Sequence, residues 1–330
     1  MTFESDYTTG GRETVRDLLV DAERRLTNVG VPSPNVDAAE IIAHALGTTR
    51  GRMILQDPVS AEQRVAVEQM LTKRLTRVPL QHLIGSTGFR HLDISVGPGV
   101  FIPRPETELV AEAAIRELAQ QPVSSRIAVD LCAGSGAIAI SLGTEVDHSR
   151  VYAVELSDDA VVWTRRNVAT YDEQLTSLGS RVEVFHHDAT SAAEPDGPLA
   201  RYAGQVSVVV TNPPYIPEGM IPREPEVRDH EPKMALYGGN DGLDVVRGVL
   251  RTAAILLKPG GLLVVEHADV QGPDAGMSGV PGVARAMTAD HIVAAHSHTA
   301  AGAPVWTDVV DRIDFNRLPR FTICRRTGAS

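Results

Sequence analysis

An asparagine, two prolines and a tyrosine follow the apolar run "VSVVV" in the segment "TNPPYIP" (211–217). Proline donates no backbone hydrogen bond, so a strand that runs into two prolines leaves the sheet there. The side-chain oxygen of Asn212 and a nearby backbone carbonyl can accept both hydrogens of a planar –NH2 group, and the ring of Tyr215 can lie against its flat face. The segment therefore predicts a site for an amide or an aryl amine, the alternative being a plain exit from the strand.

A glycine-rich turn forms a second candidate site. "VDLCAGSGAIAI" (129–140) places Gly134 and Gly136 between a predicted strand and a predicted helix, whose first N–H groups attract a negative group. Glu155 ends the next predicted strand, where a carboxylate suits the two hydroxyls of a ribose, and Asp188 ends the third, where it could meet an adenine amine. Singly, these residues also fit a simple turn or a solvated carboxylate, but together they predict a nucleoside-type ligand.

The elements that position these residues alternate along the chain from about residue 80. After the β-type alternation and turn residues of "GFRHLDISVGPGVFIPRPETE" (88–108), apolar strands are predicted at "IAVDL", "VYAVEL", "VEVFHHD", "VSVVVTNPPY" and "GGLLVVEHA". Helical segments separate them except between the third and the fourth. Alternating buried strands and helices predict the α/β class with a mostly parallel, doubly wound sheet. "DFNRLPRFTICRR" (314–326) is predicted to form the last edge strand, and residues 271–282 a mobile loop.

Residues 12–76 predict a small helical unit. One helical pattern stops at Gly30 and a second at Gly47, and Ser60 with Gln63 forms a capping box that opens a third helix. We therefore expect a helical substrate-recognition domain at 1–78, a β-hairpin or linker at 79–100, and the sheet domain at 101–330.

Composition narrows the class of protein. The net charge of −11 argues against a protein that holds duplex DNA through a basic surface. No apolar run reaches the roughly 18 residues of a membrane span, and the polar, acidic N-terminus does not resemble a secretory signal. Two cysteines are too few for a disulfide framework, and the histidines show no metal-ligand spacing. The chain is thus expected to be a cytoplasmic protein without a metal.

Four blocks give the chain a specific resemblance. "RVPLQHLIG" (77–85), "FIPRPETE" (101–108), "NPPYIP" (212–217) and "ALYGGNDGLDVVR" (235–247) resemble the HemK/PrmC family, and the similarity covers nearly the whole chain. The resemblance implies a class I S-adenosylmethionine-dependent methyltransferase of Rossmann-like fold, with seven strands, one of them antiparallel. It further implies methylation of the N5 amide nitrogen of the glutamine in the GGQ loop of peptide chain release factors, with S-adenosylhomocysteine as product.

The resemblance also assigns roles to residues. Catalysis and substrate binding are implied at Asn212, Pro213, Pro214 and Tyr215. Cofactor binding is implied at Asp130, Cys132, Ala133, Gly134, Ser135, Gly136, Glu155, Asp188, Ala189 and Asn212, and in second rank at Arg104 and Thr107. The sequence departs from the family where Cys132 replaces a common glycine, where no aromatic residue follows Asp188, and in "EHADVQG". A Cβ at position 132 is tolerable if φ is negative.

Other functions stay open at this point. They are glutamine methylation of a ribosomal protein, N6-adenine methylation of DNA, a dinucleotide-binding oxidoreductase, and a non-catalytic nucleotide-binding module. The favoured activity implies a release factor as partner, with no membrane or direct nucleic-acid partner, and a monomer. The polar segment 223–232 is either solvated surface or a flap over the substrate. No dedicated general base is expected, because the N-methylated amide is acidic enough to lose its proton afterwards, and the acceptor of that proton is left unassigned.

Overall fold

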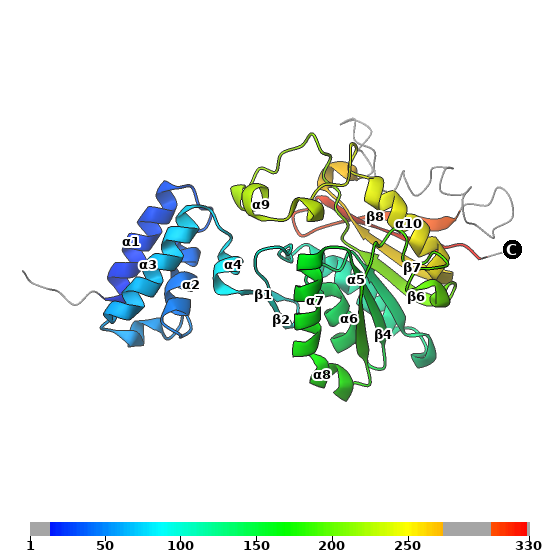
Figure 1. The fold of residues 1–330 in the computed structure, drawn as a ribbon, viewed down its shortest axis with the longest axis horizontal. Coiled ribbons are helices and arrows are strands. Elements are labelled where there is room, and N and C mark those ends of the chain that lie inside the picture. Colours follow the sequence, from blue (N-terminus) through cyan, green and yellow to red (C-terminus); the bar gives the residue numbers. More distant parts are fainter. Residues whose placement is uncertain (1–13, 273–304, 329–330) are drawn as a thin grey trace, which may run out of the picture. The chain divides into compact units, whose positions relative to one another are not determined.

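The computed structural model describes residues 14–272 and 305–328, and these form two compact units. One unit runs up to Gly85 and also includes Glu224–His230; the other runs from Ser86 to Arg223 and from Glu231 onward. Figure 1 shows the helices of the first unit and the sheet of the second. The predicted loop at 271–282 lies almost entirely outside the described residues.

The helical unit is built as its capping signals indicate. Its helices are α1 (Val15–Asn28), α2 (Pro34–Ala45), α3 (Ala61–Leu75) and α4 (Leu80–Ile84), with a short 3-10 turn η1 (Met53–Gln56). The capping box predicted at the start of α3 is present, since Ser60 and Gln63 bond each other's backbone N–H groups at 3.2 and 2.9 Å. Apolar residues on the facing sides of the helices, among them Leu26, Ile42 and Leu71, are fully buried and form one core.

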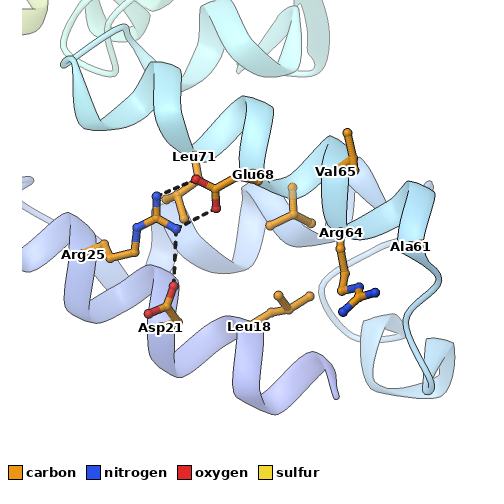
Figure 2. Close-up of a pocket in the computed structure, with 9 residues that line it drawn as sticks. Leu18, Asp21, Arg25, Ala61, Arg64, Val65, Glu68 and Leu71 are labelled. Carbon is orange, nitrogen blue, oxygen red and sulfur yellow. Dashed lines mark hydrogen bonds and ion pairs between the residues drawn. The ribbon is translucent and has the colours of Figure 1, made fainter. Parts of the chain in front are cut away.

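A hollow lies between α1 and α3 of this unit (Figure 2). Leu18 and Leu71 give it an apolar lining, and charged side chains stand around it. Arg25 on α1 bonds both carboxylate oxygens of Glu68 on α3 at 2.7 Å, which ties the two helices together across the hollow. The residues with predicted chemistry are all on the other unit.

The segment α9 (Pro225–His230) packs with the helical unit although it lies far along the chain. Glu226 accepts two hydrogen bonds from Arg77, at 2.6 and 2.7 Å, and one from Arg74 at 2.8 Å. Arg74 is only 4% exposed, and its Nε donates to Asp37 at 2.6 Å. Because a buried guanidinium needs partners for its charge and its donors, this network fixes α9 on the helical unit.

The second unit is a seven-stranded sheet in the order β5-β4-β3-β6-β7-β9-β8. Its strands are β3 (Ile127–Leu131), β4 (Arg150–Glu155), β5 (Arg181–His186), β6 (Val206–Thr211), β7 (Leu257–Glu266), β8 (Trp306–Ile313) and β9 (Pro319–Arg326). The first five pair in parallel, whereas β9 pairs antiparallel with both of its neighbours. This confirms the predicted doubly wound sheet with one antiparallel strand.

Helices cover both faces of the sheet, as a parallel sheet requires. Apolar residues of α5 (Thr107–Ala119), α6 (Ala137–Glu145) and α7 (Asp158–Thr170) share one core with one face, and α10 (Asp244–Leu256) packs on the other. The short helix α8 (Asp172–Ser177) follows α7. The hairpin β1 (Ser86–Phe89) and β2 (Leu92–Ser95) packs into the first core through Phe89, Leu92 and Ile94.

The prediction of the edge strand was wrong. β9, within the segment expected at the edge, lies between β7 and β8, and β8 is the edge strand. The burial of β9 explains its apolar "FTIC" stretch, since Phe321, Thr322 and Cys324 are all buried. β8 carried no clear signal because most of its side chains after Trp306 are exposed or half-exposed.

Candidate active site

The glycine turn lies at the carboxyl end of β3, where it enters α6. Gly134 and Gly136 have φ of +57° and +83°, a region that favours glycine. The Gly134 N–H donates to Oε2 of Glu155 at 2.7 Å, and Oε1 of Glu155 accepts from the Ser157 N–H at 2.8 Å. The structure therefore brings Glu155 to the glycine turn, as the sheet topology predicts.

Helix α7 holds this turn from the side. The Thr164 hydroxyl donates to the Gly134 carbonyl at 2.6 Å, and the side-chain amide of Asn167 donates to the Ser135 carbonyl at 2.9 Å. Asn167 also bonds the N–H and carbonyl of Ser95, each at 2.9 Å. The sequence analysis missed Asn167, because an asparagine inside a helical pattern carries no signal of its distant partners.

Asp130 and Cys132 line the approach to the same turn. Asp130 is fully buried; its Oδ2 accepts from the Ala139 N–H at 3.1 Å, while its Oδ1 has no hydrogen-bond partner in the described part of the chain. Burial raises the pKa of Asp130 to about 8. A Cβ at position 132 was expected to be tolerable if φ is negative. The φ of Cys132 is +67°, so that condition is not met. Burial also raises the pKa of the Cys132 thiol, which therefore stays protonated.

Asp188 follows β5 at the same edge of the sheet. Its Oδ1 accepts from the N–H and the hydroxyl of Thr190, both at 2.8 Å, so the side chain is fixed by its own turn. The next residue, Ala189, is 5% exposed.

Asn212 to Tyr215 leave β6 at the centre of that edge, between β3 and β7. Pro213 is buried, while Asn212 and Tyr215 are half-exposed. The loop of the "YGGNDG" block braces them: a Cβ on Gly238 would stand 2.5 Å from the Pro214 carbonyl oxygen, and one on Gly242 would stand 2.2 Å from that of Tyr215. Glycine is required at both positions by this close approach.

A side chain from beyond β7 supports the same loop. Gln271 is fully buried, and its Nε2 donates to the Tyr215 carbonyl at 3.0 Å. The sequence analysis missed Gln271 and had no role for the two bracing glycines. In the sequence, these glycines were noted only as part of the block "ALYGGNDGLDVVR". That block indicated a family but not which residues its glycines contact.

Arg104 and Thr107 contact two buried carboxylates rather than the glycine turn. Arg104 forms an ion pair with Glu231, which is 5% exposed, and its guanidinium lies 5.0 Å from the centroid of the Phe101 ring. Thr107 donates to Oε1 of Glu266, the last residue of β7, at 3.2 Å. Sequence analysis missed both carboxylates, because each lies far along the chain from its partner.

No group of three or more potential ligands in residues 14–272 and 305–328 could hold a metal ion. No helix among these residues is both long and apolar enough to cross a membrane.

The chain is similar to known proteins along most of its length. The PrmC N-terminal domain matches residues 17–85 and the methyltransferase small domain matches residues 91–221. A release factor glutamine methyltransferase of Streptomyces coelicolor is 43% identical, covering 93% of this chain and 96% of its own. One of Mycolicibacterium smegmatis is 39% identical, covering 96% and 99%. A 4-amino-L-phenylalanine/4-methylamino-L-phenylalanine methyltransferase of Streptomyces pristinaespiralis is 34% identical, covering 84% and 89%.

Proposed function

The chain belongs to the release factor glutamine methyltransferase family, and from this membership we propose that it transfers a methyl group from S-adenosylmethionine to the N5 amide nitrogen of a release factor glutamine. The observation that carries the proposal is the position of Asn212–Tyr215. This amide clamp leaves the carboxyl end of β6, and the glycine turn leaves the adjacent β3. A planar –NH2 group and a nucleoside-type ligand would therefore meet at one edge of the sheet.

The glycine turn fits S-adenosylmethionine. Beyond the chain neighbours of Gly134, no atom of the described residues lies within 4 Å of the position that a Cβ there would take, so there is room beside the backbone. The buried Asp130 Oδ1 has no hydrogen-bond partner among these residues. Glu155 would accept from the ribose hydroxyls, since each carboxylate oxygen has a lone pair left, and Asp188 with Ala189 would flank the adenine. The sulfonium of the bound cofactor supplies an electrophilic methyl group.

The chain's own residues would orient the acceptor. An amide nitrogen is a poor nucleophile because its lone pair is delocalised into the carbonyl. The Asn212 side chain and the Pro213 carbonyl would accept its two hydrogens, which stabilises the positive charge that develops on nitrogen. Alignment of nitrogen and methyl carbon at contact distance contributes roughly 7–11 kcal/mol in favourable cases.

The acceptor glutamine must enter the clamp from a protein surface. An exposed loop such as the GGQ loop of a release factor would allow this, and the helical unit would contribute recognition surface. The family to which the chain belongs and its net charge of −11 do not favour adenine in DNA. Glutamine methylation of a ribosomal protein would use the same clamp, so the acceptor protein decides between the two.

Methyl transfer from labelled S-adenosylmethionine tests the proposal. The acceptors are a purified release factor and its GGQ-loop Gln→Ala variant, with free 4-amino-L-phenylalanine as a competing aryl amine. We expect label on the wild-type factor and none on the variant or the free amine. Label on the Gln→Ala variant would place the acceptor elsewhere. Absence of label on both factors would refute the release factor as substrate, and ribosomal proteins would be assayed next.

A further inference from the structure

Glu266 is a buried carboxyl group that forms no ion pair among the residues that the structure describes. It is 2% exposed and ends β7. Its Oε1 accepts a hydrogen bond from the Thr107 hydroxyl at 3.2 Å, and its Oε2 has no hydrogen-bond partner in residues 14–272 and 305–328. A buried carboxyl oxygen with no donor is costly, so its retention calls for an explanation.

The position of Glu266 connects it to the amide clamp. In the parallel pairing of β6 with β7, Thr211 stands opposite Val265. The residues that follow this last pair are Asn212, where the chain leaves β6, and Glu266, which ends β7. They come directly after a pair on adjacent strands, which lie about 4.8 Å apart. Glu266 also contributes, after burial itself, to raising the pKa of the Tyr215 hydroxyl, so it lies within electrostatic range of the other end of the clamp.

Most of the charged groups around Glu266 form ion pairs with other residues. Arg104 forms an ion pair with Glu231, and Arg320 on β9 forms one with Asp314. Glu106, just before α5, adds a negative charge. The neighbouring residue His267 is held by Asp311 on β8, at 3.0 Å.

The balance of these contacts keeps Glu266 titratable in the neutral range. Burial raises the pKa of Glu266 to about 7, and the hydrogen bond from Thr107 and the charge of Arg320 oppose that rise. A carboxyl group with such a pKa is a far better proton acceptor at neutral pH than an exposed glutamate.

We propose that Glu266 is the proton acceptor of the methyl transfer, which rests on the function proposed above. The amide nitrogen bonds to the methyl carbon, the carbon–sulfur bond breaks and its electron pair stays on sulfur. One N–H proton passes to Oε2 of Glu266, directly or through one water molecule. The products are the N-methylamide, the thioether and a neutral carboxylic acid, which returns its proton to solvent when the products leave.

The pH dependence of a single turnover tests this role. With enzyme in excess over a release factor and saturating labelled S-adenosylmethionine, the wild-type rate should rise with pH and level off above a midpoint near 7. Glu266→Gln should lower the plateau by roughly 10²-fold, the lower end of the usual effect of a general base, and should remove the midpoint. Glu117→Gln is the matched control, because Glu117 pairs with Arg325 and does not contact the clamp residues.

Thr107→Val provides a readout that a purely structural role would not move. The Thr107 hydrogen bond lowers the pKa of Glu266, so its loss should shift the midpoint of the rate to higher pH while most of the plateau remains. If Glu266 only positioned Thr107, both variants would lower the rate at every pH and leave the midpoint in place. That result, or a wild-type profile in Glu266→Gln, would overturn the inference while label on the release factor still supported the proposed function.

Thermal stability shows whether Glu266→Gln folds and whether the group titrates as stated. The pKa of Glu266 is about 7 in the folded state and near 4.5 in the unfolded state, so the folded state holds the proton more tightly. The contribution of Glu266 to the free energy of unfolding therefore falls as pH rises from 4.5 to about 7. Glu266→Gln does not ionise, so its gain in Tm over wild type should be larger at pH 8 than at pH 5. An equal difference at both pH values would contradict the assignment.

Discussion

The side-chain amide of Gln271 donates a hydrogen bond of 3.0 Å to the backbone carbonyl of Tyr215, 56 positions earlier in the chain. The Oε1 of the same side chain accepts from the Ala268 N–H at 3.1 Å. One buried glutamine therefore links the turn after β7 to the last residue of the amide clamp. Gln271 is a positioning residue, since it acts through the backbone of Tyr215.

Replacing Gln271 by leucine should impair turnover more than cofactor binding. Leucine keeps much of the volume but leaves the Tyr215 carbonyl without its donor, so the clamp loses its fixed geometry. A displacement approaching 1 Å at such a site costs up to about 10²-fold in rate. Methyl transfer and calorimetric binding of S-adenosylhomocysteine measure the two effects. Gln205→Leu, at an exposed glutamine, is the control, and equal activity of Gln271→Leu and wild type would show that the bond has no role.

A single methyl group at position 238 should disturb the clamp. The Cβ of Gly238→Ala would stand 2.5 Å from the Pro214 carbonyl oxygen, so either the brace or the clamp must move. We expect turnover to fall by about tenfold or more, by the same misplacement argument. Gly219→Ala, in the segment between β6 and α9, is the matched control, because no described atom beyond its chain neighbours lies within 4 Å of its Cβ position. Equal rates for the two variants would argue against the brace.

Asn212→Ala should nearly abolish methyl transfer and leave cofactor binding largely intact. The substitution removes the acceptor for one amide hydrogen, while the glycine turn and Glu155 stay in place. Steady-state methyl transfer and the dissociation constant of S-adenosylhomocysteine, measured on the same preparation, separate these effects. A parallel loss of both would mean that Asn212 chiefly serves the cofactor.

The sequence predicted the sheet because its apolar strands are short, continuous and separated by helical patterns. It also placed Glu155 and Asn212 at one edge, since parallel strands carry their carboxyl ends to the same side. The edge strand β8 escaped prediction because an exposed edge lacks the apolar run that marks a buried strand. The loop after β6 was recognised from its prolines, which signal an exit from the sheet.

The supporting residues of the site were beyond sequence reasoning for a different reason. Gln271, Asn167 and Glu266 act through partners 32 to 159 positions away in the chain. Their residue types are ordinary at those positions, and only the packing of the sheet gives them a role. Conversely, the sequence alone showed that Cys132 departs from the family pattern, but its φ had to come from the structure.

Position 132 should accept glycine and reject a β-branched residue. Its φ of +67° favours glycine, and a non-glycine residue there costs of order 1–3 kcal/mol. Cys132→Gly should therefore equal or exceed wild type in free energy of unfolding, whereas Cys132→Val should be destabilised. Denaturant unfolding of the three proteins measures the order. A valine variant as stable as wild type would show that the backbone at this turn relaxes.

The Glu226 network should stabilise the helical unit in a pH-dependent manner. Burial alone would raise the pKa of Glu226, but hydrogen bonds from Arg77 and Arg74 outweigh it and lower that pKa to about 2. Because the unfolded value is near 4.5, the stabilisation is complete above that pH and is lost as pH falls towards 2. Arg74 is only 4% exposed, and Glu226→Gln removes one of its charged partners. We expect this to lower the stability of the helical unit by on the order of 3 kcal/mol at pH 7.

Hydrogen exchange of the α3 and α9 amides measures this cost as a change in local opening free energy. The difference between Glu226→Gln and wild type should shrink as pH falls from 4.5 to 2, because wild-type Glu226 then becomes neutral as well. Glu224→Gln is the matched control, since Glu224 lies two positions away, is exposed and forms no ion pair among the described residues. If the difference in opening free energy between the two proteins stayed constant from pH 4.5 to 2, the packing of the Glu226 side chain rather than its charge would stabilise α9.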